Sequence, residues 1–181
     1  MENSTKGYAM VGFAVLVIAL GSIGYTFEGE VDDIPTPNID GFVFFGDEAL
    51  PSNALALLVS AETTMTWDRD DIFIVIADEE KKDQCDGLRA NGGGFLFSDS
   101  SSQTCQYGDD GYEAKSFDSG EGLTWDVASG EHFAGIGTKS GTLPAGSDLS
   151  IDYSVKLSAS IPTYLFSVLL GLGGAAMTRM E

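Results

Sequence analysis

The stretch LSIDYSVKL, residues 149–157, decides the fold class of this chain of 181 residues. In it, every odd-numbered position is apolar and every even-numbered position is polar. Successive side chains of a β-strand point to opposite faces of a sheet, so the alternation predicts a half-buried strand. The polar positions are expected to face water, and the apolar ones to form a single core-facing row: Leu149, Ile151, Tyr153, Val155 and Leu157.

Similar patterns upstream indicate that this strand belongs to an all-β domain. Residues 72–76, Ile-Phe-Ile-Val-Ile, are apolar throughout and predict a central strand covered on both faces. A second half-buried strand is expected where apolar side chains face one way: Leu57, Val59, Ala61, Met65 and Trp67. Shorter strands are expected at 42–45, 95–97, 112–117, 123–127 and 132–136, turns at 91–94, 108–111, 119–122, 129–130 and 144–146, and a short polar helix at 78–84. Many short strands with glycine-rich turns predict an antiparallel β-sandwich of roughly 7–9 strands.

Two apolar runs flank this domain. Residues 8–25 and 161–177 have no charged side chain, and as helices they would be about 27 Å and 26 Å long at a rise of 1.5 Å per residue. The hydrocarbon core of a bilayer is about 30 Å thick, so both runs predict transmembrane helices. Ser160 and Pro162 are typical of the first turn of a helix and support the second one.

Alternatives stay open for both runs. The first is also compatible with a cleaved secretory signal that has Lys6 as its basic start, or with a prepilin-like leader cut after Gly7. The second is compatible with a sorting tail that is removed after export. The length of the first run and its single basic residue favour an uncleaved anchor.

Charge predicts the orientation. The chain has 28 acidic and 9 basic residues and a formal net charge of −19, which argues against nucleic-acid binding. Lys6 and Arg179 flank the spans on the side away from the acidic domain, and basic residues favour the cytoplasmic side. We therefore expect cytoplasmic termini at 1–7 and 178–181, spans at 8–25 and 161–177, an acidic proline-containing tether at 26–39 and an extracytoplasmic β-sandwich at 40–157 in the cell membrane.

The cysteines agree with export. Cys85 and Cys105 are the two cysteines of the chain, and an even pair in an exported domain predicts a disulfide. The alternative is two free thiols in a cytoplasmic domain.

Few residues suggest chemistry. Asp109, Asp110 and Glu113 form the best carboxylate cluster, which suggests calcium as the one cofactor to consider, although the EF-hand pattern is absent. His132 is the single histidine and has no G-x-S-x-G motif nearby, so we expect a surface or edge-strand residue and no catalytic residue.

The second apolar run also has a surface of small residues, Gly171, Gly174 and Ala175. Small residues allow helices to approach closely, which predicts packing against the first span or against a second copy of the chain.

These features favour a membrane-anchored, non-catalytic protein. It would display the acidic β-sandwich as a binding or structural module, or as an accessory subunit of an envelope complex. Its expected partners are the lipid bilayer and other membrane or envelope proteins. The alternatives are an extracytoplasmic hydrolase or metal-dependent enzyme, and a pilin-like filament subunit processed after Gly7.

Overall fold

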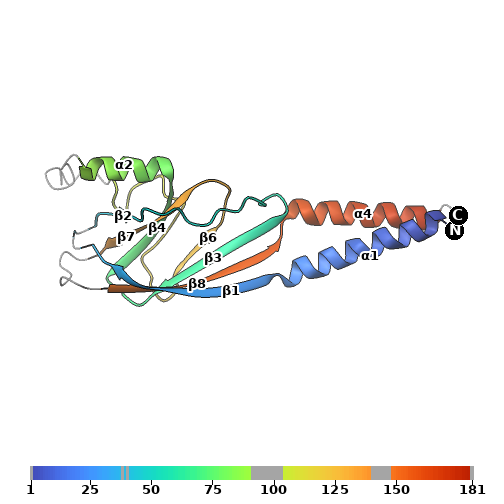
Figure 1. The fold of residues 1–181 in the computed structure, drawn as a ribbon, viewed down its shortest axis with the longest axis horizontal. Helices are drawn as coiled ribbons and strands as arrows, with labels where there is room; N and C mark the ends of the chain where they lie inside the picture. Colours follow the sequence, from blue (N-terminus) through green and yellow to red (C-terminus); the bar gives the residue numbers. More distant parts are fainter. Residues whose placement is uncertain (1, 38, 40, 91–103, 140–147, 180–181) are drawn as a thin grey trace.

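The computed structural model describes residues 2–37, 39, 41–90, 104–139 and 148–179. The molecule is elongated, with two helices side by side at one end and a body of two β-sheets at the other (Figure 1). Both chain termini lie together at the far end of the helices (Figure 1). Within the described residues the helices are α1 (Glu2–Ile23), α2 (Glu79–Ala90) and α4 (Ile161–Arg179).

The body is mostly β, as predicted, and its described residues form two antiparallel sheets of four strands each. Sheet A has the strand order β1 (Tyr25–Pro35), β8 (Asp148–Ala159), β3 (Val59–Trp67) and β6 (Leu123–Asp126). Sheet B has the order β2 (Phe44–Phe45), β7 (His132–Thr138), β4 (Ile72–Asp78) and β5 (Ala114–Ser116).

Strand β4 is central and buried on both faces, as the run of apolar residues predicts. Ile72, Ile74 and Ile76 point toward sheet A and share a core with its buried side chains: Met65, Trp67, Leu123, Trp125, Leu149 and Ile151. The intervening Phe73, Val75 and Ala77 point the other way, into a second cluster that includes Cys85 of α2. Each face of β4 therefore has its own apolar cover, which is why the strand contains no polar residue before Asp78.

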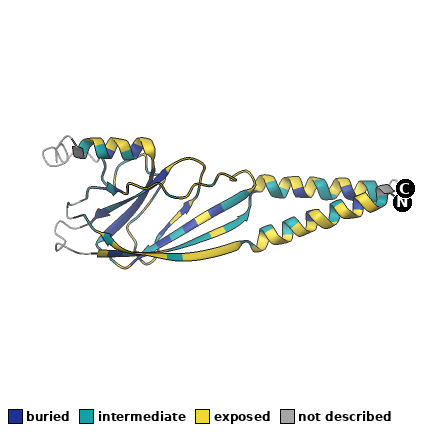
Figure 2. Ribbon diagram, in the orientation of Figure 1, coloured by how far each residue is buried: buried dark blue, intermediate teal, exposed yellow. Residues whose placement is uncertain are grey.

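Strand β8 keeps the predicted alternation but is buried along only part of its length. Leu149 and Ile151 are buried, and Asp152 and Lys156 are exposed. The row continues with Tyr153, Val155 and Leu157, which are only partly buried. Sheet A extends beyond sheet B toward the helices, so this half of β8 has no opposing sheet (Figure 2).

The predicted tether at 26–39 is wrong over most of its length. Residues 25–35 form β1, which pairs with β8 from Tyr25 opposite Leu157 to Pro35 opposite Asp148, with an irregularity between Val31 and Ile34. The acidic residues of this segment suggested a tether, but an edge strand can also carry charges because it exposes them to water at little cost. The body thus begins directly after α1.

Other boundaries differ from the expectations. Leu57 does not join β3; it lies in a turn and its residue surface is 77% exposed. The short polar helix extends to Ala90 and begins where the Asp78 carboxylate accepts a hydrogen bond from the Lys81 N–H at 2.9 Å. The expected strand at 95–97 and the turns at 91–94 and 144–146 lie outside the described residues.

The predicted disulfide between Cys85 and Cys105 is confirmed. It joins residues 20 apart in sequence, with Cα atoms 5.6 Å apart, and ties α2 to the segment that precedes β5. Both cysteines are fully buried in the cluster on the outer face of β4. The disulfide therefore holds the cover of that face in place.

Substitutions at neighbouring positions of β8 test its burial. Ile151→Asp should lower the free energy of unfolding by about 3 kcal/mol, because it buries an unpaired carboxylate between the sheets. Asp152→Ala on the exposed face should change it by less than about 0.5 kcal/mol. Thermal and chemical denaturation of both variants measure this, and equal effects would contradict the assignment of the faces.

The disulfide has a matching test. Cys85→Ser should lower stability by about 3 kcal/mol, since in the chain-entropy model the closed loop restricts the unfolded chain. Reduction of the unsubstituted protein should produce a comparable loss, and the variant itself should be insensitive to reductant. Denaturation with and without reductant checks both statements, and a variant as stable as the parent would refute them.

Candidate functional site

The two terminal helices, α1 and α4, pack against each other and form the first candidate site. They run antiparallel and are in contact along their length (Figure 1). Small residues at buried or close-contact positions recur every seven residues: Gly7, Ala14 and Gly21 on α1, and Ser167 and Gly174 on α4. A seven-residue spacing keeps one face of each helix turned toward the other, as in a coiled coil.

Glycine is required where the helix backbones come closest. A Cβ atom on Gly7 would lie 2.6 Å from the carbonyl oxygen of Gly174, and one on Gly174 would lie 2.7 Å from the carbonyl oxygen of Gly7. At the other end of the helices, a Cβ atom on Gly21 would lie 2.4 Å from the Cβ of Ala159. Small residues thus hold the helices together by close backbone packing.

The outer surface of this helix pair, α1 with α4, is apolar. Both helices are long and apolar enough to cross a membrane by length and composition, over Ser4–Ile23 and Ile161–Arg179. Exposed on α1 are Tyr8, Phe13, Val15, Leu16, Leu20 and Ile23. Exposed on α4 are Ile161, Leu165, Phe166, Val168, Leu169 and Leu172.

The small residues predicted for helix packing are only partly brought together. Gly174 is buried against α1, and Gly171 lies beside Ala14. Ala175 is exposed and points away from the contact. The sequence reasoning missed the residues of α1, although their seven-residue spacing was a readable signal. The face of α4 that carries Gly174 thus packs against α1 of the same chain, as one of the two expectations has it.

A single residue joins each helix to sheet A. Gly24, between α1 and β1, has a φ of 69° and donates its N–H to the Leu20 carbonyl at 3.1 Å. Ser160, between β8 and α4, donates its hydroxyl to the Leu57 carbonyl at 2.5 Å and accepts the Thr163 N–H at 3.4 Å. Neither connection has slack, so the helix pair and sheet A form one stiff unit.

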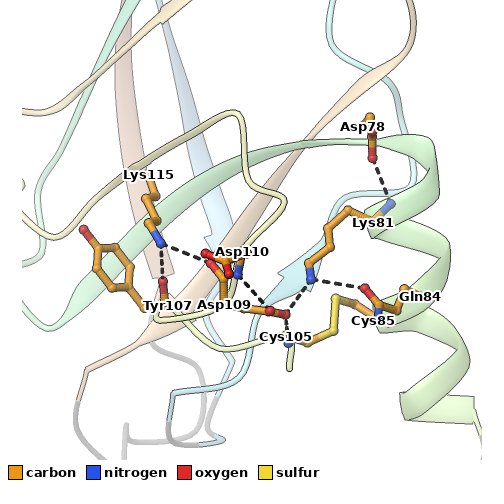
Figure 3. Close-up of polar contacts among 9 residues, drawn as sticks. All are labelled: Asp78, Lys81, Gln84, Cys85, Cys105, Tyr107, Asp109, Asp110 and Lys115. Carbon is orange, nitrogen blue, oxygen red and sulfur yellow. Dashed lines mark hydrogen bonds and ion pairs between the residues drawn. A yellow bond between two sulfur atoms is a disulfide. The ribbon is translucent and has the colours of Figure 1, made fainter. Parts of the chain in front are cut away.

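The three predicted calcium ligands do not converge. Asp109 accepts hydrogen bonds from Lys81 Nζ at 2.5 Å and from the Cys105 N–H at 2.6 Å, beside the disulfide (Figure 3). Asp110 is exposed, and the Glu113 carboxylate accepts a hydrogen bond from the indole N–H of Trp125. Among the described residues no group of three or more metal-ligating side chains comes together.

The contacts of Asp109 account for the lowered pKa of its carboxyl group. Burial by itself would raise the pKa of Asp109, but the hydrogen bonds from Lys81 and from the Cys105 N–H outweigh it and leave the pKa below its usual range. The buried Lys81 also donates to Gln84 Oε1 at 3.1 Å (Figure 3). This pair fixes α2 to the loop that carries Asp109 and is structural.

His132 is not the surface or edge-strand residue that the sequence predicts. It is buried on β7, which lies between β2 and β4, and its Nε2 atom is 3.1 Å from Glu113 Oε2. The same carboxylate oxygen accepts the indole N–H of Trp125 at 3.2 Å. These three side chains come together through the pairing of strands that are far apart in the sequence, so no local sequence pattern predicts the contact.

An open pocket of about 470 Å³ lies on the face of sheet B that is turned away from sheet A. Its described lining combines three rings with an amide, a lysine and small residues: Gly41, Phe73, Gln106, Tyr107, Gly108, Phe117, Thr138 and Lys139. Lys139 donates to the backbone carbonyls of Asp70 and Phe117. The titratable side chains among these lining residues are Tyr107 and Lys139.

The close packing of the helices predicts unequal effects of the same substitution on neighbouring positions. Gly174→Ile should lower stability by about 1–3 kcal/mol, because the side chain would collide with the Gly7 backbone and force the helices apart. Ala175→Ile adds the same apolar side chain on the exposed side and should leave the melting temperature in detergent nearly unchanged. Equal shifts for the two variants would show that α1 does not pack on this face.

The sequence matches no protein-family model and no curated protein. One solved structure that it resembles is described as "The Structure of Tomato Aspermy Virus by X-Ray Crystallography". The TM-score is 0.37 with 13% sequence identity, over 76% of this chain and 79% of that chain. Similarity at this level supports no inference about fold or function, and the function has to be inferred from the chain's own residues.

Proposed function

We propose that this chain is a membrane-anchored, non-catalytic protein that displays its two-sheet body outside the cell as a binding or structural module. In this proposal the helix pair crosses the bilayer as a hairpin, and the β-sandwich stands directly on the membrane surface. The observation that carries the proposal is the apolar outer surface of the helix pair, joined without a flexible linker to a polar, acidic body.

The energetics favour a lipid environment for the helix pair. Twelve large apolar side chains are exposed on it, six on each helix. Removing such side chains from water is worth on the order of 1–2 kcal/mol each when they are about half exposed. The sum is comparable with the whole stability of a typical domain, about 5–15 kcal/mol, so water is a poor surrounding for this surface.

Charge and covalent structure favour one orientation. Lys6 and Arg179 lie toward the end of the helix pair where both termini meet (Figure 1). Basic residues are retained on the cytoplasmic side, so both termini would be cytoplasmic and the acidic body extracytoplasmic. The Cys85–Cys105 disulfide fits an oxidising compartment.

The polar side chains of the body favour a role without catalysis. Three of the residues that the sequence suggests for chemistry have partners within the body: Asp109 pairs with Lys81, and Glu113 lies against His132 and accepts a hydrogen bond from Trp125. The stiff connection to the membrane suits a module that presents a surface at a fixed height, as an accessory subunit of an envelope complex would.

Protease protection tests the proposal. The chain is expressed with a different tag at each terminus, and protease is added to intact cells. The body should be degraded, while both tags stay protected because they lie inside; after permeabilisation both tags should be lost. A tag removed from outside would refute the hairpin, and a mature protein without its N-terminal tag would show that α1 is cleaved rather than retained.

A further inference from the structure

Three exposed apolar side chains continue from the helix pair onto β1: Tyr25, Phe27 and Val31, here called the β1 strip. Their residue surfaces are 68%, 41% and 48% exposed, respectively. The register places Phe27 opposite Val155, and Val31 opposite Ile151. On the other side of β8, Ile151 is also opposite Trp67 of β3, and both side chains belong to the core between the sheets. Because directly paired residues share a face, the β1 strip lies on the core face of sheet A, at its uncovered margin.

The opposite face of β1 is charged. Glu28 is opposite Ser154, and Glu30 is opposite Asp152, on the face of sheet A turned away from the core. The negative charges of Asp32 and Asp152 raise the pKa of Glu30, which shows that like charges already crowd that side. The alternation therefore separates an apolar, uncharged surface from an acidic one on the same strand.

Lipid does not reach along the whole β1 strip. Val31 is seven residues beyond Gly24, which corresponds to about 23 Å at roughly 3.3 Å per residue. The headgroup region on one side of a bilayer is only about 5–8 Å thick. The outer part of the strip therefore needs a protein partner if it is to be covered.

We propose that a second copy of this chain, anchored in the same membrane, covers the β1 strip, so that the protein forms a parallel two-fold dimer. This inference rests on the proposed membrane anchoring. A second copy presents the same apolar strip at the same height above the bilayer, because a single residue fixes each helix to sheet A. A two-fold axis along the molecule brings the strips together and keeps the two acidic faces apart on the outside.

The size of the strip predicts that the helices take part. A Tyr or Phe side chain contributes about 150–250 Å² when fully buried, so three partly exposed residues supply a few hundred Å² per copy. A stable soluble interface needs about 800 Å² per partner. Ile23 and Leu20, which precede the strip in sequence and are exposed on α1, would have to add contact area within the membrane. Confinement to one membrane also raises the effective concentration of the two copies.

Pairing through the free edge of β1 is the competing arrangement. Within the part of the chain that the structure describes, β1 is the outermost strand of sheet A and has no strand beyond it. Edge pairing would bring Glu28 and Glu30 of both copies together as well as Phe27. Packing through the β1 strip brings only the apolar positions of the two copies together. A cross-link at position 28 as well as at position 27 therefore distinguishes edge pairing from packing through the strip.

Single cysteines at adjacent positions test the dimer in the full-length protein. Both native cysteines are paired in the disulfide, so an introduced cysteine supplies the single free thiol. Phe27→Cys and Glu28→Cys are expressed, and isolated membranes are oxidised with copper(II) phenanthroline, which accepts the electrons as two thiols become a disulfide. On a non-reducing gel, Phe27→Cys should give a reducible band at twice the chain mass of 19.1 kDa, at least five times stronger than Glu28→Cys.

Val31→Cys is the second strip position and should cross-link like Phe27→Cys. Equal cross-linking at positions 27 and 28 would overturn the proposal in favour of edge pairing or random collision. No dimer from either strip position, or an adduct of another mass, would overturn it in favour of an unpaired strip or a different partner. Recovery of the chain in the soluble fraction would instead refute the membrane anchoring, so the two failures are distinguishable.

Discussion

The pairing of β1 with β8 is the interaction on which the rest of this structure depends. It joins the two strands that lead directly from α1 and into α4, so it brings the two ends of the chain together. The last register pair before the helices, Tyr25 opposite Leu157, fixes where the helices begin, and the seven-residue rows of small residues meet from there. With one residue at each junction, a displacement of either strand would move a helix out of register. The strand pairing and the helix pair are therefore one mechanical unit.

Two kinds of packing stabilise the two ends of the molecule. Between the sheets, large side chains such as Trp67, Ile74 and Trp125 fill the space, and the hydrophobic effect drives their burial. Between the helices, glycine and serine allow backbones to touch, which suits an environment where burial of apolar surface supplies no driving force. This division agrees with the proposed membrane anchoring, in which sheet A connects the helix pair in lipid to the body in water and exposes its acidic face to water.

The polar residues of the body serve its architecture. Lys81 and Asp109 link α2 to the loop beside the Cys85–Cys105 disulfide, and His132 and Glu113 lie together near Trp125. In these contacts, carboxylate, amine and imidazole groups, which are the types found in metal sites and in acid–base catalysis, pair with one another. The body presents an acidic sheet face and an apolar strip on β1 outward. These features support the proposed role in recognising another protein surface.

The sequence by itself determined the elements whose signal is local. Alternation specified β8 and most of β3, the Ile72–Ile76 run specified the doubly covered β4, and the paired cysteines and the two apolar runs were readable from composition. The tertiary structure alone decided what depends on distant partners. It made an acidic segment the edge strand β1, buried His132 between neighbouring strands, left Leu57 and Ala175 exposed, and brought Glu113 within hydrogen-bond distance of Trp125. The physical reason is that the burial and partners of a side chain are set by strand pairing and helix register, which bring together residues far apart in the sequence.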